Sequence, residues 1–199
     1  KNGDTLRGAY GRLKKIIDKS RHGGGTFILG IGTNDILLPY LKSLSLFWFL
    51  TMNLRCKIKR CIENDDIFER EYDKLLQLCS EKNKRVIVFG IPFINLKNFP
   101  HEKTVRRNAV IKRLAQKYNY SFIDIYELQK ETLLPDKRTY TWKYGFAFRL
   151  IDAVIMTLLP FCKDGFAKAR GLNASVDGVH FNSASAKILA AEIEKAVLQ

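Results

Sequence analysis

The sequence has few of the residues that bind metals. Its 199 residues include only three histidines, and the four cysteines (Cys56, Cys61, Cys79 and Cys162) do not have the paired spacing of a zinc site. No unbroken apolar run is long enough to cross a bilayer. The pattern therefore favours neither a structural metal site nor a transmembrane protein, and it implies no cofactor.

The chain begins at Lys1 and not at a methionine, and its start has no recognisable signal peptide. The missing signal peptide carries little information if an N-terminal segment has been removed. Nothing in the cysteine spacing demands a disulfide, so the simplest expectation is a reducing, cytoplasmic compartment.

The composition is that of one globular domain over residues 1–199, with 46% hydrophobic and 27% charged residues. The net charge is +14, and the excess lysines and arginines are scattered along the chain. Their ordinary interpretation is solvated helix faces. The functional alternative is attraction to an anionic partner, such as a membrane surface, an acidic glycan or nucleic acid.

Apolar periodicity predicts a chain that alternates between helices and buried strands. Strands are expected at 26–32, 86–92 and 121–125, and helices at 4–18, 66–82, about 103–118 and 183–198. Asp4 or Thr5 can cap the first helix, and Asn182 or Ser183 the last. This alternation predicts an α/β fold with a parallel sheet and right-handed crossovers.

Two segments, at about 36–62 and 130–170, depart from this rhythm and are interpreted as inserts. The strongly apolar stretch 36–54 is by default a core helix; the alternative is a lid or an interfacial anchor, which the basic segment Arg55–Arg60 supports. The second insert holds a basic-aromatic patch, Lys137–Tyr144, and a helix expected over about 146–159. It is either a surface excursion or a wall of a substrate cleft.

Two polar clusters have the residue types of a catalytic site. Asn34 follows a buried strand, where a side-chain amide can donate to an oxyanion. In the sequence Asp177-Gly178-Val179-His180, the carboxylate can bond one imidazole nitrogen and leave the other to accept a proton. Because ligands bind at the carboxyl ends of parallel strands, we expect the fold to bring the two clusters together.

These residues resemble the SGNH/GDSL hydrolase superfamily. Gly32-Thr33-Asn34-Asp35 is similar to the third block of the family, and Asp177-Gly178-Val179-His180 to the fifth. Gly3 resembles the glycine of the second block. The resemblance implies a flavodoxin-like three-layer α/β/α sandwich, with His180 as general base, Asp177 as its orienting partner, and Asn34 and Gly3 as oxyanion donors. It implies no metal and no cofactor.

The first block of that family, Gly-Asp-Ser, has no counterpart in the chain. We interpret this as an N-terminal truncation, so we expect a sheet with three parallel strands and an exposed edge. The intact protein is expected to be a serine esterase or acyl-ester hydrolase, and the chain as supplied to lack the nucleophile. A lipid ester and an acylated carbohydrate are both open as substrates; the apolar segment 36–54 favours the first and the Trp142 region the second.

The alternative from another class is a non-catalytic binding module for an anionic partner (a glycan, a membrane surface or nucleic acid). A nucleic-acid partner is the least expected of these, because its binding would need one continuous basic face. The sequence does not indicate an oligomeric state.

Overall fold

The computed structural model describes residues 4–19, 25–133, 139–142, 158 and 160–198, and these form two compact units. The first draws on Lys1–Ile91, Glu102–Asp124 and Lys195–Gln199. The second draws on Pro92–His101 and Ile125–Glu194. We describe each unit by itself.

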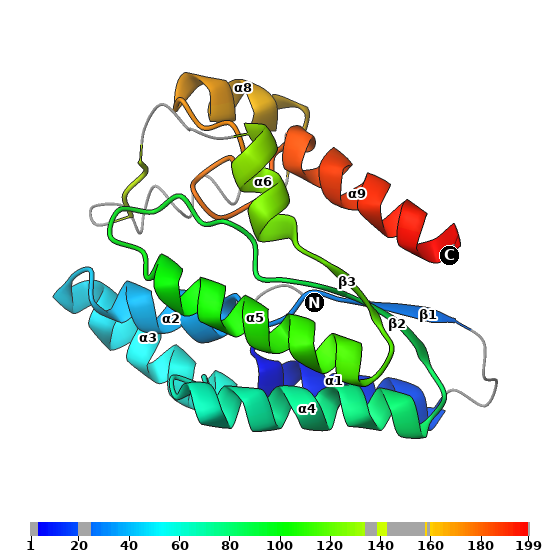
Figure 1. Cartoon of the computed structure of the whole chain (residues 1–199). Helices are drawn as coiled ribbons and strands as arrows, with labels where there is room; N and C mark the ends of the chain where they lie inside the picture. The colour runs from blue at the N-terminus through cyan, green and yellow to red at the C-terminus, as the bar shows by residue number, and fades with distance from the viewer. Residues whose placement is uncertain (1–3, 20–24, 134–138, 143–157, 159, 199) are drawn as a thin grey trace. The chain divides into compact units, whose positions relative to one another are not determined.

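The first unit contains a parallel sheet of three strands (Figure 1): β1 (Thr26–Leu29), β2 (Arg85–Phe89) and β3 (Ser121–Ile123), in the order β1-β2-β3. The central strand β2 is buried from Val86 to Val88, as expected for a strand covered on both faces. Within the described ranges β1 pairs with β2 alone, so its other edge is open. The predicted α/β fold, its parallel sheet and the exposed edge are confirmed.

Three predicted helices of this unit are also confirmed: α1 (Leu6–Lys19), α4 (Asp65–Glu81) and α5 (His101–Lys117). Helices α4 and α5 run side by side (Figure 1). A series of ion pairs links them: Arg107–Asp65 at 2.8 Å, Arg113–Glu69 at 2.9 Å and Lys117–Asp73 at 2.8 Å. At the start of α1 the Thr5 hydroxyl accepts the Gly8 N–H, so Thr5 takes the capping position.

The apolar stretch 36–54 forms parts of two helices, α2 (Asn34–Lys42) and α3 (Leu46–Lys59), and not one. The chain turns at Ser43–Ser45, and the Ser45 hydroxyl accepts the Trp48 N–H as the N-cap of α3. The core-helix interpretation holds for α2, whose apolar side chains are buried. It is wrong for much of α3, which buries only Trp48, Met52 and Cys56.

The second unit contains α6 (Ile125–Leu133), the 3-10 helix η1 (Pro160–Cys162), α8 (Lys163–Ala169) and most of α9 (Ser183–Leu198). Asn182, and not Ser183, caps α9, because its Oδ1 accepts the Ser185 N–H at 3.0 Å. The expected helix over 146–159 lies outside the described residues, except for position 158.

Four helices end in the same way, with one residue in the left-handed region: Arg60 after α3, Asn83 after α4, Asn119 after α5 and Gly171 after α8. In each case the next N–H donates to a carbonyl of the last helical turn, at 2.9 to 3.1 Å. This Schellman arrangement satisfies carbonyls that the helix end leaves unpaired.

Candidate active site

Asn34 begins α2 directly after the loop that leaves β1. Gly32 has a φ of +118° there, and a Cβ at this position would lie 3.0 Å from the Ile91 side chain, so the loop requires glycine. The Asn34 Nδ2 donates to the Asp4 carbonyl at 2.8 Å. A carboxamide has two N–H donors, so this bond fixes the side chain and leaves a second donor for a ligand.

A cleft of about 440 Å³ leads along β1 to Asn34. One wall is β1 and the loop after it, and the other is the α1 side that carries Arg12, Leu13 and Ile16. Asp4 also lines the cleft. Gly3, the predicted second oxyanion donor, lies outside the described residues, so its role stays a prediction.

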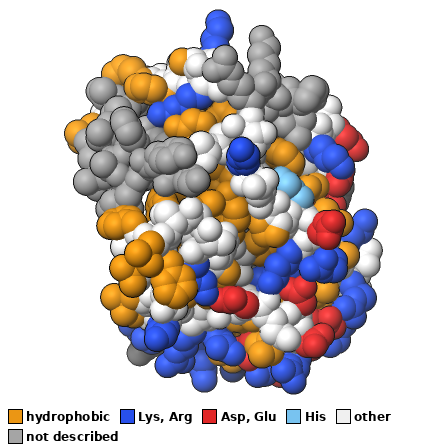
Figure 2. Space-filling view, turned by 90° about the vertical axis from the view of Figure 1, so that its left-hand side faces the viewer, with side chains coloured by type: hydrophobic (Ala, Val, Ile, Leu, Met, Phe, Trp, Pro, Cys, Tyr) orange, Lys and Arg blue, Asp and Glu red, His pale blue; other side chains and the backbone are white. Residues whose placement is uncertain are grey.

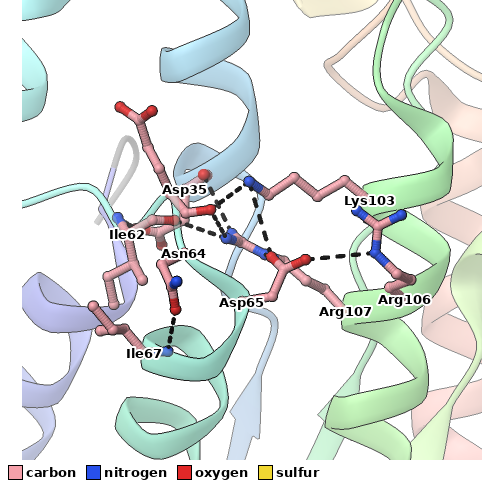
Figure 3. Close-up of polar contacts among 9 residues, drawn as sticks. Asp35, Ile62, Asn64, Asp65, Ile67, Lys103, Arg106 and Arg107 are labelled. Carbon is pink, nitrogen blue, oxygen red and sulfur yellow. Dashed lines mark hydrogen bonds and ion pairs between the residues drawn. The ribbon is translucent and has the colours of Figure 1, made fainter.

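Asp35, next to Asn34, ties three segments together. Its side chain is fully buried, and its two oxygens accept the N–H groups of Leu6 and Ile62, each at 2.8 Å. Figure 3 shows the contact with Ile62. Burial raises the pKa of Asp35 to about 6, against the opposing effect of these two hydrogen bonds and of Arg107. The carboxyl group therefore anchors the starts of α1 and α2 to the segment after α3.

Arg107 completes this network from α5 (Figure 3). Pro39 has no N–H, so the Asp35 carbonyl lacks its helical partner, and Arg107 Nη1 donates to it at 3.2 Å. Arg107 Nη2 donates to the Ile62 carbonyl at 2.8 Å, and the guanidinium stacks on Phe68 at 4.2 Å from the ring centroid. The interpretation of the basic residues as solvated is wrong for Arg107, whose side chain is 0% exposed.

The second polar cluster lies in a tight loop before α9. Nδ1 of His180 is 2.8 Å from Oδ2 of Asp177, so the expected carboxylate–imidazole hydrogen bond is present. The other carboxylate oxygen accepts the N–H groups of Val179 and His180, at 3.0 and 2.9 Å. Asp177 is 1% exposed, whereas the His180 side chain is 59% exposed. A fixed carboxylate thus holds an imidazole that solvent and ligands can reach.

The electrostatics of this pair suit a general base. Burial acts to raise the pKa of Asp177, but the hydrogen bonds from the His180 ring and from the two backbone N–H groups outweigh it and hold the pKa below its ordinary value. Asp177 therefore stays ionised at neutral pH and stabilises an imidazolium. Because His180 Nδ1 donates to the carboxylate, its Nε2 is the nitrogen that can take a proton.

Backbone contacts fix the loop that carries the pair. Gly178 has a φ of +88°, and a Cβ there would lie 2.8 Å from the Asn95 carbonyl oxygen. The Gly178 carbonyl accepts the Asn95 N–H at 2.8 Å, and the Gly178 N–H donates to the Ser175 hydroxyl at 3.0 Å. Only glycine fits between these contacts.

Trp142 also holds this loop, in a way that the sequence did not reveal. Its indole Nε1 donates to the Asp177 carbonyl at 2.9 Å, and its side chain is 6% exposed. The Trp142 side chain is therefore buried, and whether this insert forms a wall of a substrate cleft stays a prediction. The remainder of the patch, apart from residues 139–141, lies outside the described residues.

The candidate residues are divided between the units: Asn34 belongs to the first, and Asp177 and His180 to the second. Their expected meeting at one edge of the sheet stays a prediction. Within the described ranges no three His, Cys, Asp or Glu side chains are grouped as a metal site would need.

Comparisons with known proteins identify a family and a fold. A family model described as GDSL-like Lipase/Acylhydrolase matches residues 1–193. The acetylxylan esterase Axe2 from Geobacillus stearothermophilus is similar in structure, with a TM-score of 0.58 and 18% identity over 98% of this chain and 68% of that one. The acetyl xylan esterase AlAXEase gives a TM-score of 0.56 and 16% identity, over 98% of this chain and 77% of that one.

A third similar structure is LAE5, an alpha/beta hydrolase enzyme from the metagenome of Lake Arreo, Spain, with a TM-score of 0.56 and 14% identity over 98% of this chain and 68% of that one. The comparison with curated proteins found no matching sequence. At these identities the structural similarity establishes the fold, and the family model establishes the family.

Proposed function

Since the chain belongs to the GDSL-like lipase/acylhydrolase family, we propose that it forms the base and oxyanion side of a serine esterase site. The observation that carries this proposal is the His180–Asp177 pair, with its 2.8 Å hydrogen bond, buried carboxylate and exposed imidazole. His180 Nε2 takes the proton of the attacking hydroxyl and later returns it to the leaving alcohol. Asp177 keeps the ring in the required tautomer.

The oxyanion of the tetrahedral intermediate is assigned to donors of the first unit. The Asn34 side chain has one N–H bound to the Asp4 carbonyl, and its second N–H is proposed to donate to the oxyanion, together with the Gly3 amide. Removing one such donor typically lowers kcat by about 10²–10³. Asp35 and Arg107 act as positioning residues, because they hold the start of α2 in place.

The nucleophile is proposed to be a serine carried on a strand encoded before Lys1. No serine of the chain follows a strand in a Gly-Asp-Ser pattern. Along one edge β1 pairs with no strand among the described residues, and a cleft lies beside it; both support this arrangement, since a further strand can pair there. Water, deprotonated by His180, then hydrolyses the acyl-serine, so the proposed reaction uses the serine, the pair, the oxyanion donors and water.

For the substrate we propose a small acyl ester, with an acylated carbohydrate as the first choice. The similar structures named as acetylxylan esterases support this choice. A lipid ester is the second choice, supported by the exposed apolar side of α3.

The test is hydrolysis of 4-nitrophenyl acetate and of acetylated xylo-oligosaccharide by the chain with and without its upstream coding sequence. The extended protein should hydrolyse both, and the 199-residue chain neither. In the extended protein, His180→Ala should lower kcat by about 10³ or more and Asn34→Ala by about 10². His101→Ala is the matched histidine control and should retain activity.

Two results would contradict the proposal. Unchanged hydrolysis in the His180→Ala variant would remove the assignment of the base. Hydrolysis by the 199-residue chain that depends on His180 would place the nucleophile inside the chain and refute the upstream serine.

A non-catalytic module for an anionic partner is the second candidate function. The basic segment 36–62, which contains five lysines and arginines and no acidic residue, favours it. If the protein binds an anionic partner but hydrolyses no ester, this function is supported over the first.

A further inference from the structure

Helix α3 carries a stripe of exposed leucine and isoleucine side chains. Leu46, Leu50, Leu54 and Ile58 follow one another at intervals of four residues and are 74%, 62%, 62% and 70% exposed. Residues four apart lie above one another on a helix, so these side chains form one continuous face. Phe49, at 46% exposed, lies on its flank. We refer to these five residues as the α3 face.

The opposite side of α3 is already packed. Trp48, Met52 and Cys56, also four residues apart, are each less than 9% exposed. The first nine residues of the helix are therefore apolar on both sides, apart from Thr51 and Asn53. A helix that is apolar all round normally lies in an apolar environment. Here only the side with Trp48, Met52 and Cys56 is buried, and the α3 face is exposed.

The charges around the α3 face have one sign. Arg55, Lys57 and Arg60 lie at the C-terminal end of the helix, are exposed, and make no ion pair with any residue that the structure describes. Between Asp35 and Glu63 the sequence has no acidic residue. Figure 2 views the side on which α2 and α3 lie in Figure 1, and it shows surface hydrophobic side chains at the left with lysine and arginine side chains below them.

We propose that the α3 face docks on an anionic lipid surface. The leucines enter the boundary between headgroups and acyl chains, and Arg55, Lys57 and Arg60 contact lipid phosphates. A helix suits this role because its own hydrogen bonds satisfy its backbone, and the long stem of Lys57 allows its charge to reach the headgroup level. A second copy of the chain packed with its α3 helix parallel fits the face less well, since that contact would bring the two basic ends together.

The helix lies on such a surface and does not pass through it. Helix α3 has 14 residues, and no helix in the described part of the chain is long and apolar enough to cross a bilayer. The docking involves none of Asn34, Asp177 and His180, so it stands or fails separately from the proposed catalysis.

The test is co-sedimentation of the 199-residue chain with vesicles of ether-linked phospholipids, which contain no ester that an esterase could cleave. One set is phosphatidylcholine alone, and the other is an equal mixture with phosphatidylglycerol. The chain should sediment with the mixed vesicles and remain in solution with the neutral ones. Added salt should weaken the binding, because it screens the charge attraction.

Two variants separate the apolar and charged contributions. Leu50→Ser with Leu54→Ser should weaken binding to mixed vesicles more than about tenfold, from the apolar area of two leucine side chains. Arg55→Gln, Lys57→Gln and Arg60→Gln together should weaken it about a hundredfold, at about fivefold per charge. All five side chains are exposed, so the fold should be unchanged by circular dichroism.

Matched controls carry the same changes elsewhere on the first unit. Val105→Ser with Val197→Ser removes two exposed apolar side chains, and Arg70→Gln, Lys82→Gln and Lys112→Gln remove three exposed charges. The apolar control should bind as the wild type does, and the charge control should lose far less binding than the α3 variant.

Three outcomes would overturn the proposal. One is a chain that stays in solution with both vesicle sets. Another is binding that the leucine substitutions leave unchanged. The third is a dimer in sedimentation velocity that Leu50→Ser with Leu54→Ser dissociates, because it would assign the α3 face to a second copy.

Discussion

At the scale of single residues, backbone conformation decides whether the candidate site can form. The His180–Asp177 pair depends on a loop that turns through Gly178, and Asn34 depends on a loop that turns through Gly32. Both glycines have positive φ values and neighbours where a Cβ would be. The sequence motif records these glycines, and the structure gives the reason for them.

Substitution of Gly178 tests this dependence. Gly178→Ala should lower the free energy of unfolding by about 2 kcal/mol or more, because it combines a strained φ with a contact to the Asn95 carbonyl. Gly165→Ala in α8 is the matched control: no atom lies within 4 Å of its Cβ, so the change should be neutral or stabilise by about 0.5–1 kcal/mol. Urea denaturation measures both. Equal effects of the two substitutions would contradict this account.

Asp35 gives the protein a pH dependence of a definite sign. Burial raises its pKa from 3.8 to about 6, so between these values the folded chain binds more protons than the unfolded chain. The free energy of unfolding should therefore fall as the pH rises from about 4 to 6, by on the order of 3 kcal/mol from this group.

The measurement is urea denaturation across this pH range, for the wild type and for Asp35→Asn. The variant should lose most of the decrease, since it has no carboxyl group to titrate. Asp177 contributes with the opposite sign: its pKa is lowered, so its stabilisation is present above about pH 4 and lost as the pH falls further. Parallel curves for wild type and Asp35→Asn would refute the raised pKa.

At the scale of elements, α5 holds the start of α2 through one side chain. Arg107 supplies the hydrogen bond that Pro39 cannot give to the Asp35 carbonyl, and it pairs with Asp65 at the start of α4. The same two helices are joined further along by the more exposed pair of Arg113 and Glu69. The two pairs differ in burial and so should differ in energy.

Removal of each arginine measures that difference. Arg107→Met should destabilise the fold by about 3 kcal/mol or more, because it leaves buried carbonyls without donors and removes the nearest of the basic partners of Asp65. Arg113→Met, two turns along α5, should cost less than about 1 kcal/mol, as is usual for a surface pair. A comparable loss of stability in the two variants would show that burial of Arg107 does not matter.

The sequence was informative for elements whose pattern is local. Periodicity located α1, α4, α5 and α9 and the three strands, because each has a clear apolar side or run. The motifs located Asn34, Asp177 and His180. The strands end earlier than predicted, since Gly30 and Gly90 already belong to the loops after β1 and β2.

Long-range contacts were the part that the sequence could not supply. Arg107 acts on Asp35, which is 72 residues away, and adjacent Arg106 looks the same in the sequence but is exposed. Trp142 resembles a surface aromatic until its bond to the Asp177 carbonyl is seen. The division of 36–54 into α2 and α3 was hidden by an apolar run without periodicity. The single domain and the meeting of the two site clusters stay predictions.

At the scale of the whole molecule, charge is the dominant feature. A net charge of +14 on 199 residues means that the folded chain repels itself more than the expanded unfolded chain does. Salt screens this repulsion. The isolated surface ion pairs, which salt weakens, contribute little by comparison.

Stability should therefore increase with ionic strength. We expect the free energy of unfolding in urea to rise by about 1 kcal/mol between low salt and a few tenths molar sodium chloride. The variant with Arg55→Gln, Lys57→Gln and Arg60→Gln, which has three fewer charges, should show a smaller increase. A fall in stability with salt would mean that ion pairs outweigh the repulsion.

The left-handed residues that end the helices offer a route to greater heat tolerance. Position 171 already has glycine, the residue best suited to this conformation, whereas Asn83 and Asn119 are asparagines. Both asparagines are exposed and far from Asn34 in the sequence, so Asn83→Gly and Asn119→Gly should each stabilise by about 0.5–1 kcal/mol. Together they should raise the melting temperature by several degrees, at about 2–4 °C per kcal/mol, in a thermal scan. Asn83→Ala, which keeps the strain, should lower it.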